Sequence, residues 1–417
     1  MRQFAGLIVA FLLLPVMLKC YPKVSGGKKA PLGPLLCLTG LIMAVIGGLS
    51  AGVMLDSLKR VFTTFSTLQT LIVVIEIGVL GSILKKYGIL ERIVHALEQL
   101  LPSKKALIMI LPGIMGMLPV PGGAFLSAPF VDSIGTELGI SGERKAVINL
   151  YFRHFAMFIL PYNTTILTIG SVLDSINIYS LIGLNLGFVV FLLGGAWFFY
   201  IRTVPDSRSP RQGSRGQALL DVLKYLSPIY MAMVFNVVFG LQMYQAVFLC
   251  ILLTFFLIGK DKSEYLKSAA QGFALDTVLM LVGVYFMQNV VKNLDVVMSG
   301  VGGMLVGDSI LSFMLIVPLV GLAFGLTTGI SMVPLGILLP FIAGMSLPPM
   351  TMTVYAFYIL VWSFLGYYFS PFHLCQLLTI KVMECPSGEV YKQHLRMMPV
   401  LALSSMALFL LYRMIFI

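Results

Sequence analysis

The chain has 417 residues, of which 59% are hydrophobic and only 11% charged, and its mean hydropathy is +0.97. A soluble protein of this length cannot cover so apolar a surface with so few charges, so the composition indicates a polytopic membrane protein in contact with the lipid bilayer. The net charge of +11 does not indicate a nucleic-acid partner, because most basic residues lie in the short segments between apolar stretches.

Ten apolar stretches approach the roughly 20 residues that a membrane-spanning helix needs. They fall at 4–18, 31–54, 62–84, 147–175, 178–201, 218–238, 241–259, 270–290, 353–383 and 395–416. The first could be read as a secretory signal, but no small-residue cleavage site follows it, so we interpret it as a span. The sequence therefore predicts five spans in each half of the chain.

Two further apolar regions predict re-entrant hairpins. They cover 106–136 and 309–345, and each carries Pro or Gly near its middle, at Pro119–Gly123 and Gly325–Gly329. An amphipathic segment at 88–102 precedes the first hairpin and predicts a helix in the membrane interface, with a weaker counterpart at 293–306. The polar segment 202–217, at the midpoint, reads as a linker between the halves.

The second half repeats the helix-breaking residues of the first. Pro112 recurs as Pro318 and Gly123 as Gly329, each 206 residues later, and Pro161 recurs as Pro371, 210 residues later. An interval of about half the chain indicates two copies of one unit. Because each copy is predicted to cross the bilayer five times, the second must be inverted, an arrangement found in secondary transporters.

The basic residues predict the orientation. With the N-terminus outside, 22 of the 28 Lys and Arg residues fall on one side, five fall on the other, and Arg153 lies within a span. This positive-inside bias predicts a multi-pass protein of the cytoplasmic (inner) membrane of a prokaryote, with both termini outside.

The order of spans, paired hairpins and surface connectors resembles the ion transporter superfamily, which includes gluconate permeases, the arsenite pump subunit and sodium-coupled dicarboxylate carriers. Within it, the chain is most similar to an uncharacterised family of prokaryotic integral membrane proteins. The resemblance implies an elevator mechanism, in which a scaffold, often dimeric, holds a mobile body that carries the substrate. It implies scaffold parts at 1–87 and 218–292, arm helices at 88–102 and 293–306, and transport parts at 103–201 and 307–417.

Four interruptions are the candidate substrate site. Broken backbone at membrane depth is tolerated only where it faces protein or a water-filled cavity, and helix ends there can bind ions. The candidate substrate-binding residues are Pro121, Gly122, Gly123, Arg153, Asn163, Thr164, Thr165, Thr327, Thr328, Gly329, Ser331 and His373. Asn163-Thr164 resembles an Asn-Thr signature of the superfamily, although the hairpin tips lack Asn.

Each candidate also has a structural interpretation. The tip glycines could serve only as tight turns, and the threonines could bond their own helix carbonyls. Thr164 and Thr328 could instead ligate Na⁺. Arg153 could attract a carboxylate substrate or pair with Glu76 or Asp276, the carboxylates that we expect well inside spans. His154, His373, Glu76 and Asp276 are the candidates for coupling transport to H⁺.

The favoured function is a secondary transporter of a small organic anion of carboxylate type, coupled to H⁺ or Na⁺. A channel is the alternative, and an intramembrane enzyme is less favoured because no metalloprotease or paired-aspartate motif occurs. No phosphate-binding loop is present, so we expect no nucleotide hydrolysis by the chain itself. The five cysteines show no Cys-x-x-Cys spacing and predict neither disulfides nor a metal site.

Overall fold

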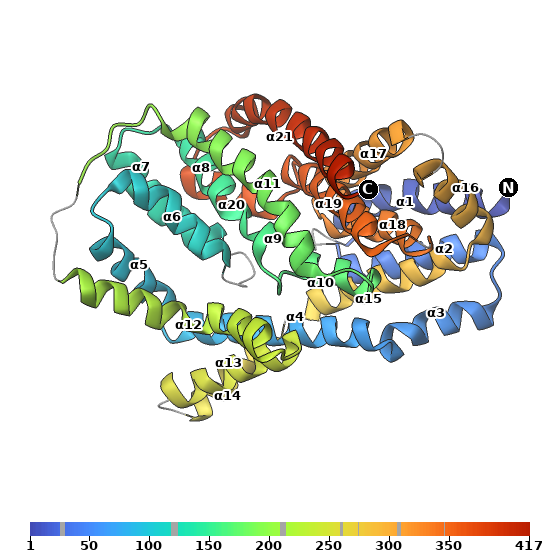
Figure 1. Cartoon of the computed structure of the whole chain (residues 1–417), viewed down its shortest axis with the longest axis horizontal. Coiled ribbons are helices and arrows are strands. Elements are labelled where there is room, and N and C mark those ends of the chain that lie inside the picture. The colour runs from blue at the N-terminus through green and yellow to red at the C-terminus, as the bar shows by residue number, and fades with distance from the viewer. Residues whose placement is uncertain are drawn as a thin grey trace.

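The computed structural model describes residues 1–25, 30–117, 124–208, 214–258, 262–273, 275–306, 310–345 and 347–417. Throughout these ranges the regular structure consists of helices, as expected for a chain that must satisfy its backbone hydrogen bonds within the bilayer. Figure 1 shows an elongated bundle in which long helices lie side by side and shorter, interrupted ones meet near the middle.

The first half of the chain contains eleven α-helices and one π-helical turn in its described residues. They are α1 (Arg2–Val24), α2 (Leu32–Gly47), α3 (Ala51–Thr63), α4 (Phe65–Lys86), α5 (Ile89–Leu100), α6 (Lys104–Met117), α7 (Ala124–Glu137), α8 (Gly142–His154), α9 (Ala156–Ile159), α10 (Thr164–Val172), α11 (Ile178–Ala196) and η1 (Trp197–Ile201).

The second half presents helices in a corresponding order. They are α12 (Arg215–Phe239), α13 (Met243–Ile258), α14 (Lys262–Gln271), α15 (Leu275–Lys292), α16 (Asp295–Val306), α17 (Ile310–Thr328), α18 (Met332–Ala343), α19 (Pro349–Tyr368), α20 (Leu374–Met383) and α21 (Ser387–Phe416). In both halves a long helix is followed by a 16-residue helix, a short helix and another long one.

The structure confirms a multi-pass membrane protein. Nine helical segments within the described residues are long and apolar enough to cross a bilayer, and four shorter apolar helices accompany them. The predicted span 31–54 is wrong at its end. The helix α2 stops at Gly47 because Gly48 takes a left-handed φ of +80°, and Ser50 caps a separate helix, α3, by accepting a hydrogen bond from the Val53 amide at 3.3 Å. The charged helix α3 was not predicted.

Both predicted hairpin regions contain two helices that pack on each other, α6 with α7 and α17 with α18. The second differs from the prediction in its proportions. The helix α17 runs on through Gly325 to Thr328, so the turn begins only at Gly329. With 19 residues, α17 is roughly 28 Å long, enough to cross the hydrocarbon layer alone.

The predicted surface helix at 88–102 forms as α5, but protein covers much of its apolar face. Its buried residues include Ile89, Ile93 and Leu97, and the helix packs against α12 and α4. The Arg92 guanidinium lies 5.7 Å from the centre of the Tyr225 ring on α12. The counterpart, α16, packs against α1, α17 and α18. Each short helix therefore touches the first long helix of the opposite half.

The packing separates two groups of helices. One group comprises α1, α2 and α15, together with α4, α12 and α13, which lie along one long edge in Figure 1. The other comprises α6 to α8, α11 and α19 to α21, which pack mainly among themselves. The interrupted helix α8–α9–α10 reaches from the second group to α4 in the first. The candidate residues Arg153, His154 and Asn163 to Thr165 belong to this interrupted helix or to its breaks.

Candidate functional site

The first interruption separates α9 from α10 at Leu160–Asn163, where the sequence predicted a break. Proline has no N–H, so Pro161 cannot continue the helical hydrogen bonds. The Asn185 side-chain amide on α11 donates to the carbonyl of Phe158 at 2.9 Å, which satisfies a carbonyl near the end of α9. The Asn163 side chain accepts a hydrogen bond from the Thr165 amide at 2.9 Å and caps α10. Asn163 is therefore a helix cap in this conformation.

The second interruption joins the second hairpin. The Ser370 hydroxyl donates to the carbonyl of Leu326 on α17 at 2.6 Å, and the Phe372 amide donates to the Ser370 hydroxyl at 3.1 Å. Gly329 has a φ of +68°, and a Cβ there would lie 2.7 Å from the backbone of Phe372. The hairpin turn and the break before α20 are thus in direct contact, and only glycine fits at the turn.

The hydroxyls at the second hairpin bond their own helix. Thr327 donates to the carbonyl of Ala323, and Thr328 to that of Phe324, each at 2.6 Å. Thr328 and Ser331 are buried, whereas Thr327 is exposed. In this conformation the threonines therefore bond their own helix carbonyls, as the structural alternative predicted. Each hydroxyl oxygen keeps a lone pair that could bind a cation or accept a hydrogen bond.

Arg153 lies in a buried cluster that links the two halves of the chain. Its side chain is only 8% exposed, and the guanidinium interacts with the Cys375 thiol and the Tyr367 hydroxyl. Arg153 belongs to α8, Tyr367 to α19 and Cys375 to the first turn of α20. The positive side chain thus lies beside the N-terminal end of a broken helix, where free N–H groups also favour negative charge.

Two histidines complete this cluster. The ring centres of His154 and His373 are 4.9 Å apart, and both side chains are buried. Nδ1 of His154 bonds to the Leu150 carbonyl at 2.7 Å, and Nδ1 of His373 to the Tyr368 carbonyl at 3.2 Å. A carbonyl only accepts, so Nδ1 carries the proton in each ring and Nε2 presents a lone pair.

The two Nε2 atoms have different surroundings. Nε2 of His154 lies 3.3 Å from the Tyr367 hydroxyl, which can donate to it. Nε2 of His373 has no hydrogen-bond partner among the described residues. One ring nitrogen of each histidine and the Cys375 sulfur all lie within 4.8 Å of one another. A ligand that accepts lone pairs would therefore meet three donors here.

Glu76 and Asp276 do not occupy equivalent places. Glu76 is in the middle of α4, and its Oε2 is buried with no hydrogen-bond partner in the described part of the chain. Asp276 is exposed in the first turn of α15, within the apolar helical segment Lys262–Lys292, so its place inside a span stays a prediction. An acidic residue in a first helical turn is stabilised by the helix dipole, which explains its place there.

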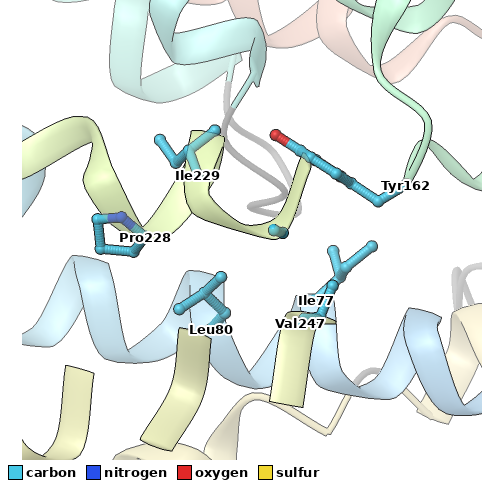
Figure 2. Close-up of a pocket in the computed structure, with 7 residues that line it drawn as sticks. Ile77, Leu80, Tyr162, Pro228, Ile229 and Val247 are labelled. Carbon is cyan, nitrogen blue, oxygen red and sulfur yellow. The ribbon is translucent and has the colours of Figure 1, made fainter. Parts of the chain in front are cut away.

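The break at Tyr162 faces the first group of helices. A small apolar pocket is lined by Tyr162 together with residues of α4, α12 and α13. Figure 2 shows the Tyr162 ring above Ile77, with its hydroxyl toward Ile229. At the other end of α10, the Ser66 hydroxyl on α4 donates to the Ser171 carbonyl at 3.2 Å. These two contacts make α4 and α10 antiparallel and bring Glu76 level with the break.

The structure brings together only part of the predicted site. Arg153, His154 and His373 share one cluster, and Thr328 and Gly329 adjoin it through the second interruption. Within the described residues, no hydrogen bond or ring contact joins Asn163, Thr164 or Thr165 to that cluster. Pro121, Gly122 and Gly123 lie outside the described residues. The carbonyl of Met117, the last described residue before them, lies 3.5 Å from the Tyr162 hydroxyl.

Two residues of the cluster were not predicted as part of a site. Tyr367 gave no local signal, because aromatic residues are common in apolar spans. Cys375 was interpreted as a packing thiol, although it follows His373 by two residues. The short His-x-Cys spacing at a helix break was the available signal.

Fold and site together define a multi-pass membrane protein with two interrupted helices that meet at a buried, polar, histidine-containing cluster. Residues 24–414 match the family described as "Protein of unknown function (DUF401)", and the chain belongs to this family. No curated protein matches the chain.

Proposed function

We propose that the chain is a secondary active transporter that moves a small anion, of carboxylate type, across the cytoplasmic membrane by an elevator mechanism. The observation that carries the proposal is the position of Arg153. Its buried guanidinium lies beside Cys375 at the start of α20, where the helix N-terminus adds positive potential. A permanent positive charge within an apolar span costs at least about 2.5 kcal/mol on insertion scales, so such residues usually serve ion or substrate pathways.

The packing between the two halves supports two inverted repeats. In the first half α2 packs on α15, and the corresponding helix of the second half, α13, packs on α4. Two further pairs of contacts correspond in the same way. The contact of α3 with α15 corresponds to that of α14 with α4, and the contact of α5 with α12 corresponds to that of α16 with α1. The return helix of each hairpin also follows this rule, because α7 packs on α20 and α18 packs on α10. Related by a two-fold axis in the membrane plane, such repeats build alternating-access sites.

Departures from this symmetry support the elevator mechanism. The helix α10 packs on α4, but within the described residues its counterpart α20 has no comparable contact with α15. Likewise, α18 packs on α15, whereas its counterpart α7 has no comparable contact with α4 in that part of the chain. In an elevator, the mobile body contacts the scaffold unequally at each end of its movement. If each repeat adopted the contacts that the other repeat now makes, the mobile body would stand at the opposite end of its movement.

The scaffold in this proposal consists of 1–87 and 218–292, and the mobile body of 103–201 and 307–417. The apolar surface between Tyr162 and α4, α12 and α13 offers few polar groups to resist sliding. Related architectures suggest a homodimer through the scaffold, which the mass of the detergent-solubilised protein would test. Both termini are proposed to face outward, on the basis of the positive-inside distribution.

Glu76 is the coupling group that the geometry supports best. A buried carboxylate without a hydrogen-bond partner is costly when ionised, so its proton occupancy can follow the side from which it is exposed. It stands on the proposed scaffold, level with the break in the proposed mobile body. Sodium coupling through Thr164 and Thr328 is the alternative that mutants would separate from proton coupling.

The proposal is tested by uptake in proteoliposomes. Purified protein is reconstituted, and accumulation of radiolabelled gluconate-like acids, dicarboxylates and short monocarboxylates is followed under an imposed pH or Na⁺ gradient. Accumulation above the equilibrium level, abolished by collapsing the gradient, supports a secondary transporter. Flux that only equalises concentrations supports the channel alternative, and chemical change of a substrate without net movement supports the enzyme alternative.

A further inference from the structure

We propose that His154, His373 and Cys375 form a binding site for a soft monovalent metal ion, Cu(I). The site goes beyond the proposed transport function and does not depend on it. Its ligand atoms come from α8 and from the start of α20, so a bound ion would tether the two halves of the chain at their interrupted helices.

The distances suit a three-coordinate site. One ring nitrogen of each histidine and the Cys375 sulfur lie within 4.8 Å of one another, and the Nε2 atoms are the ones that the tautomers leave with a lone pair. Metal–nitrogen and metal–sulfur bonds of about 2.0 and 2.3 Å place the ligand atoms of a trigonal site roughly 3.5 Å apart. Small side-chain rotations therefore suffice to close the cluster around an ion. The Tyr367 hydroxyl, now 3.3 Å from Nε2 of His154, would turn away.

The second shell is already in the form that metal-bound histidines use. Ligating histidines commonly donate their other N–H to a carbonyl, which fixes the tautomer and the ring orientation. Here Leu150 and Tyr368 supply those carbonyls, at 2.7 and 3.2 Å from Nδ1. The Nε2 lone pair of His373 is fully buried and has no partner in the described residues, and such a group is costly to leave unused.

Charge favours Cu(I) over Zn²⁺. Binding converts the Cys375 thiol to a metal-bound thiolate and releases its proton to water, so Cu(I) and thiolate together add no net charge. Arg153 already places one positive charge beside the thiol. Zn²⁺ would add a further positive charge in the same apolar region, and it usually requires a fourth ligand. Thiolate and imidazole ligands at low coordination number suit Cu(I).

Titration of purified full-length protein with Cu(I), buffered by a coloured bicinchoninate complex under anaerobic conditions, tests the site. We expect one tightly held Cu(I) per chain. X-ray absorption of that complex should show one sulfur and two imidazole nitrogens. Substituting Cys375→Ser, His154→Gln or His373→Gln should weaken the binding by about tenfold or more, as loss of a supporting group alone does at metal sites.

Two control variants carry the same side-chain types outside the cluster. His95→Gln changes an exposed histidine on α5, and Cys385→Ser changes a thiol after α20. Both should keep the Cu(I) affinity of the wild type. The X-ray absorption spectrum is measured on the wild-type complex, so it tests the ligand set even if a variant fails to fold.

Three results would overturn the assignment. These are sulfur-only ligation, unchanged affinity in folded variants of all three ligands, and displacement of Cu(I) by an equal amount of Zn²⁺. Because the readout is metal stoichiometry and ligation, absence of anion uptake would refute the transport proposal without affecting this result.

Discussion

The Ser66 hydroxyl on α4 donates a hydrogen bond to the Ser171 carbonyl on α10 at 3.2 Å, and so joins the proposed scaffold to the proposed mobile body. If α10 slides past α4 during transport, a covalent link here must stop the cycle. In a background without other cysteines, we expect the S66C/S171C pair to form a disulfide on oxidation, because the hydrogen bond places these two residues beside each other. We expect oxidised protein to lose uptake and reduced protein to regain it.

The matched control links the start of the proposed mobile body to the linker residues that directly follow its first part. The Ser103 hydroxyl donates to the Asp206 carboxylate at 3.0 Å at the start of α6, so an oxidised S103C/D206C pair should still transport. Full uptake by the oxidised Ser66–Ser171 pair, with the disulfide verified by mass spectrometry, would contradict relative movement of α4 and α10.

Gly329→Ala should destabilise the second hairpin. The substitution forces a side chain into a left-handed backbone conformation, with φ of +68°, and places Cβ 2.7 Å from the Phe372 backbone. We expect a loss of about 2 kcal/mol or more, visible as a lower Tm in a thermal-shift assay. Gly183→Ala is the control, because a Cβ there meets nothing within 4 Å. Equal Tm values for the two variants would show that the turn tolerates a side chain.

Glu76→Gln should uncouple transport. The amide keeps the size of the side chain but cannot exchange a proton, so uptake driven by a pH gradient should fall to background while exchange of substrate across the membrane continues. Thr164→Ala and Thr328→Ala should leave proton-driven uptake intact. If instead these two variants raise the Na⁺ concentration needed for uptake and Glu76→Gln has no effect, sodium is the coupling ion.

Arg153 should determine affinity for the anion. A hydrogen bond between charged groups contributes about 1.5–3 kcal/mol, so Arg153→Gln should raise the apparent KM roughly 10- to 100-fold. Arg153→Lys keeps the charge but loses the planar fork of donors and should fall between wild type and Arg153→Gln. Initial rates over a substrate series measure this. A lower maximal rate at unchanged KM in both variants would assign Arg153 a structural role.

Cys385 should react as a slow thiol. Burial first, and then the nearby Glu143 carboxylate, raise the pKa of the Cys385 thiol. Because the thiolate is the nucleophile, its alkylation by maleimide should reach half of its maximal rate at a higher pH than that of a free cysteine, about 8.5. Mass spectrometry of the labelled peptide resolves Cys385 from the other cysteines.

Glu143→Gln provides the matched comparison for this thiol, since it removes the negative charge and should move the alkylation midpoint to lower pH. An unchanged midpoint would mean that burial alone raises the pKa. A membrane-impermeant maleimide should reach Cys385 only from the cytoplasmic side, and labelling from outside in intact cells would reverse the proposed orientation.

The sequence alone was sufficient for the features that the bilayer imposes locally. Apolar length predicted most of the spans, and proline at Pro161 and Pro371 predicted the two interruptions, because a missing N–H breaks a helix wherever it occurs. The sequence was insufficient to predict a helix end that depends on a single residue. Gly48 ends α2 seven residues before the predicted end of its span, at 54, and this end depends on a single left-handed glycine.

The tertiary structure decided which polar residues share a site. His154 meets Tyr367, 213 residues later in the chain, because α8 packs on α20, which follows α19 directly, and no periodicity in either segment reports that packing. The same packing left Asn163 as a helix cap and placed Asp276 at an exposed helix start. Pattern and composition determine how each segment satisfies its own backbone in lipid, whereas side-chain partners depend on how separate helices pack, which only the folded chain specifies.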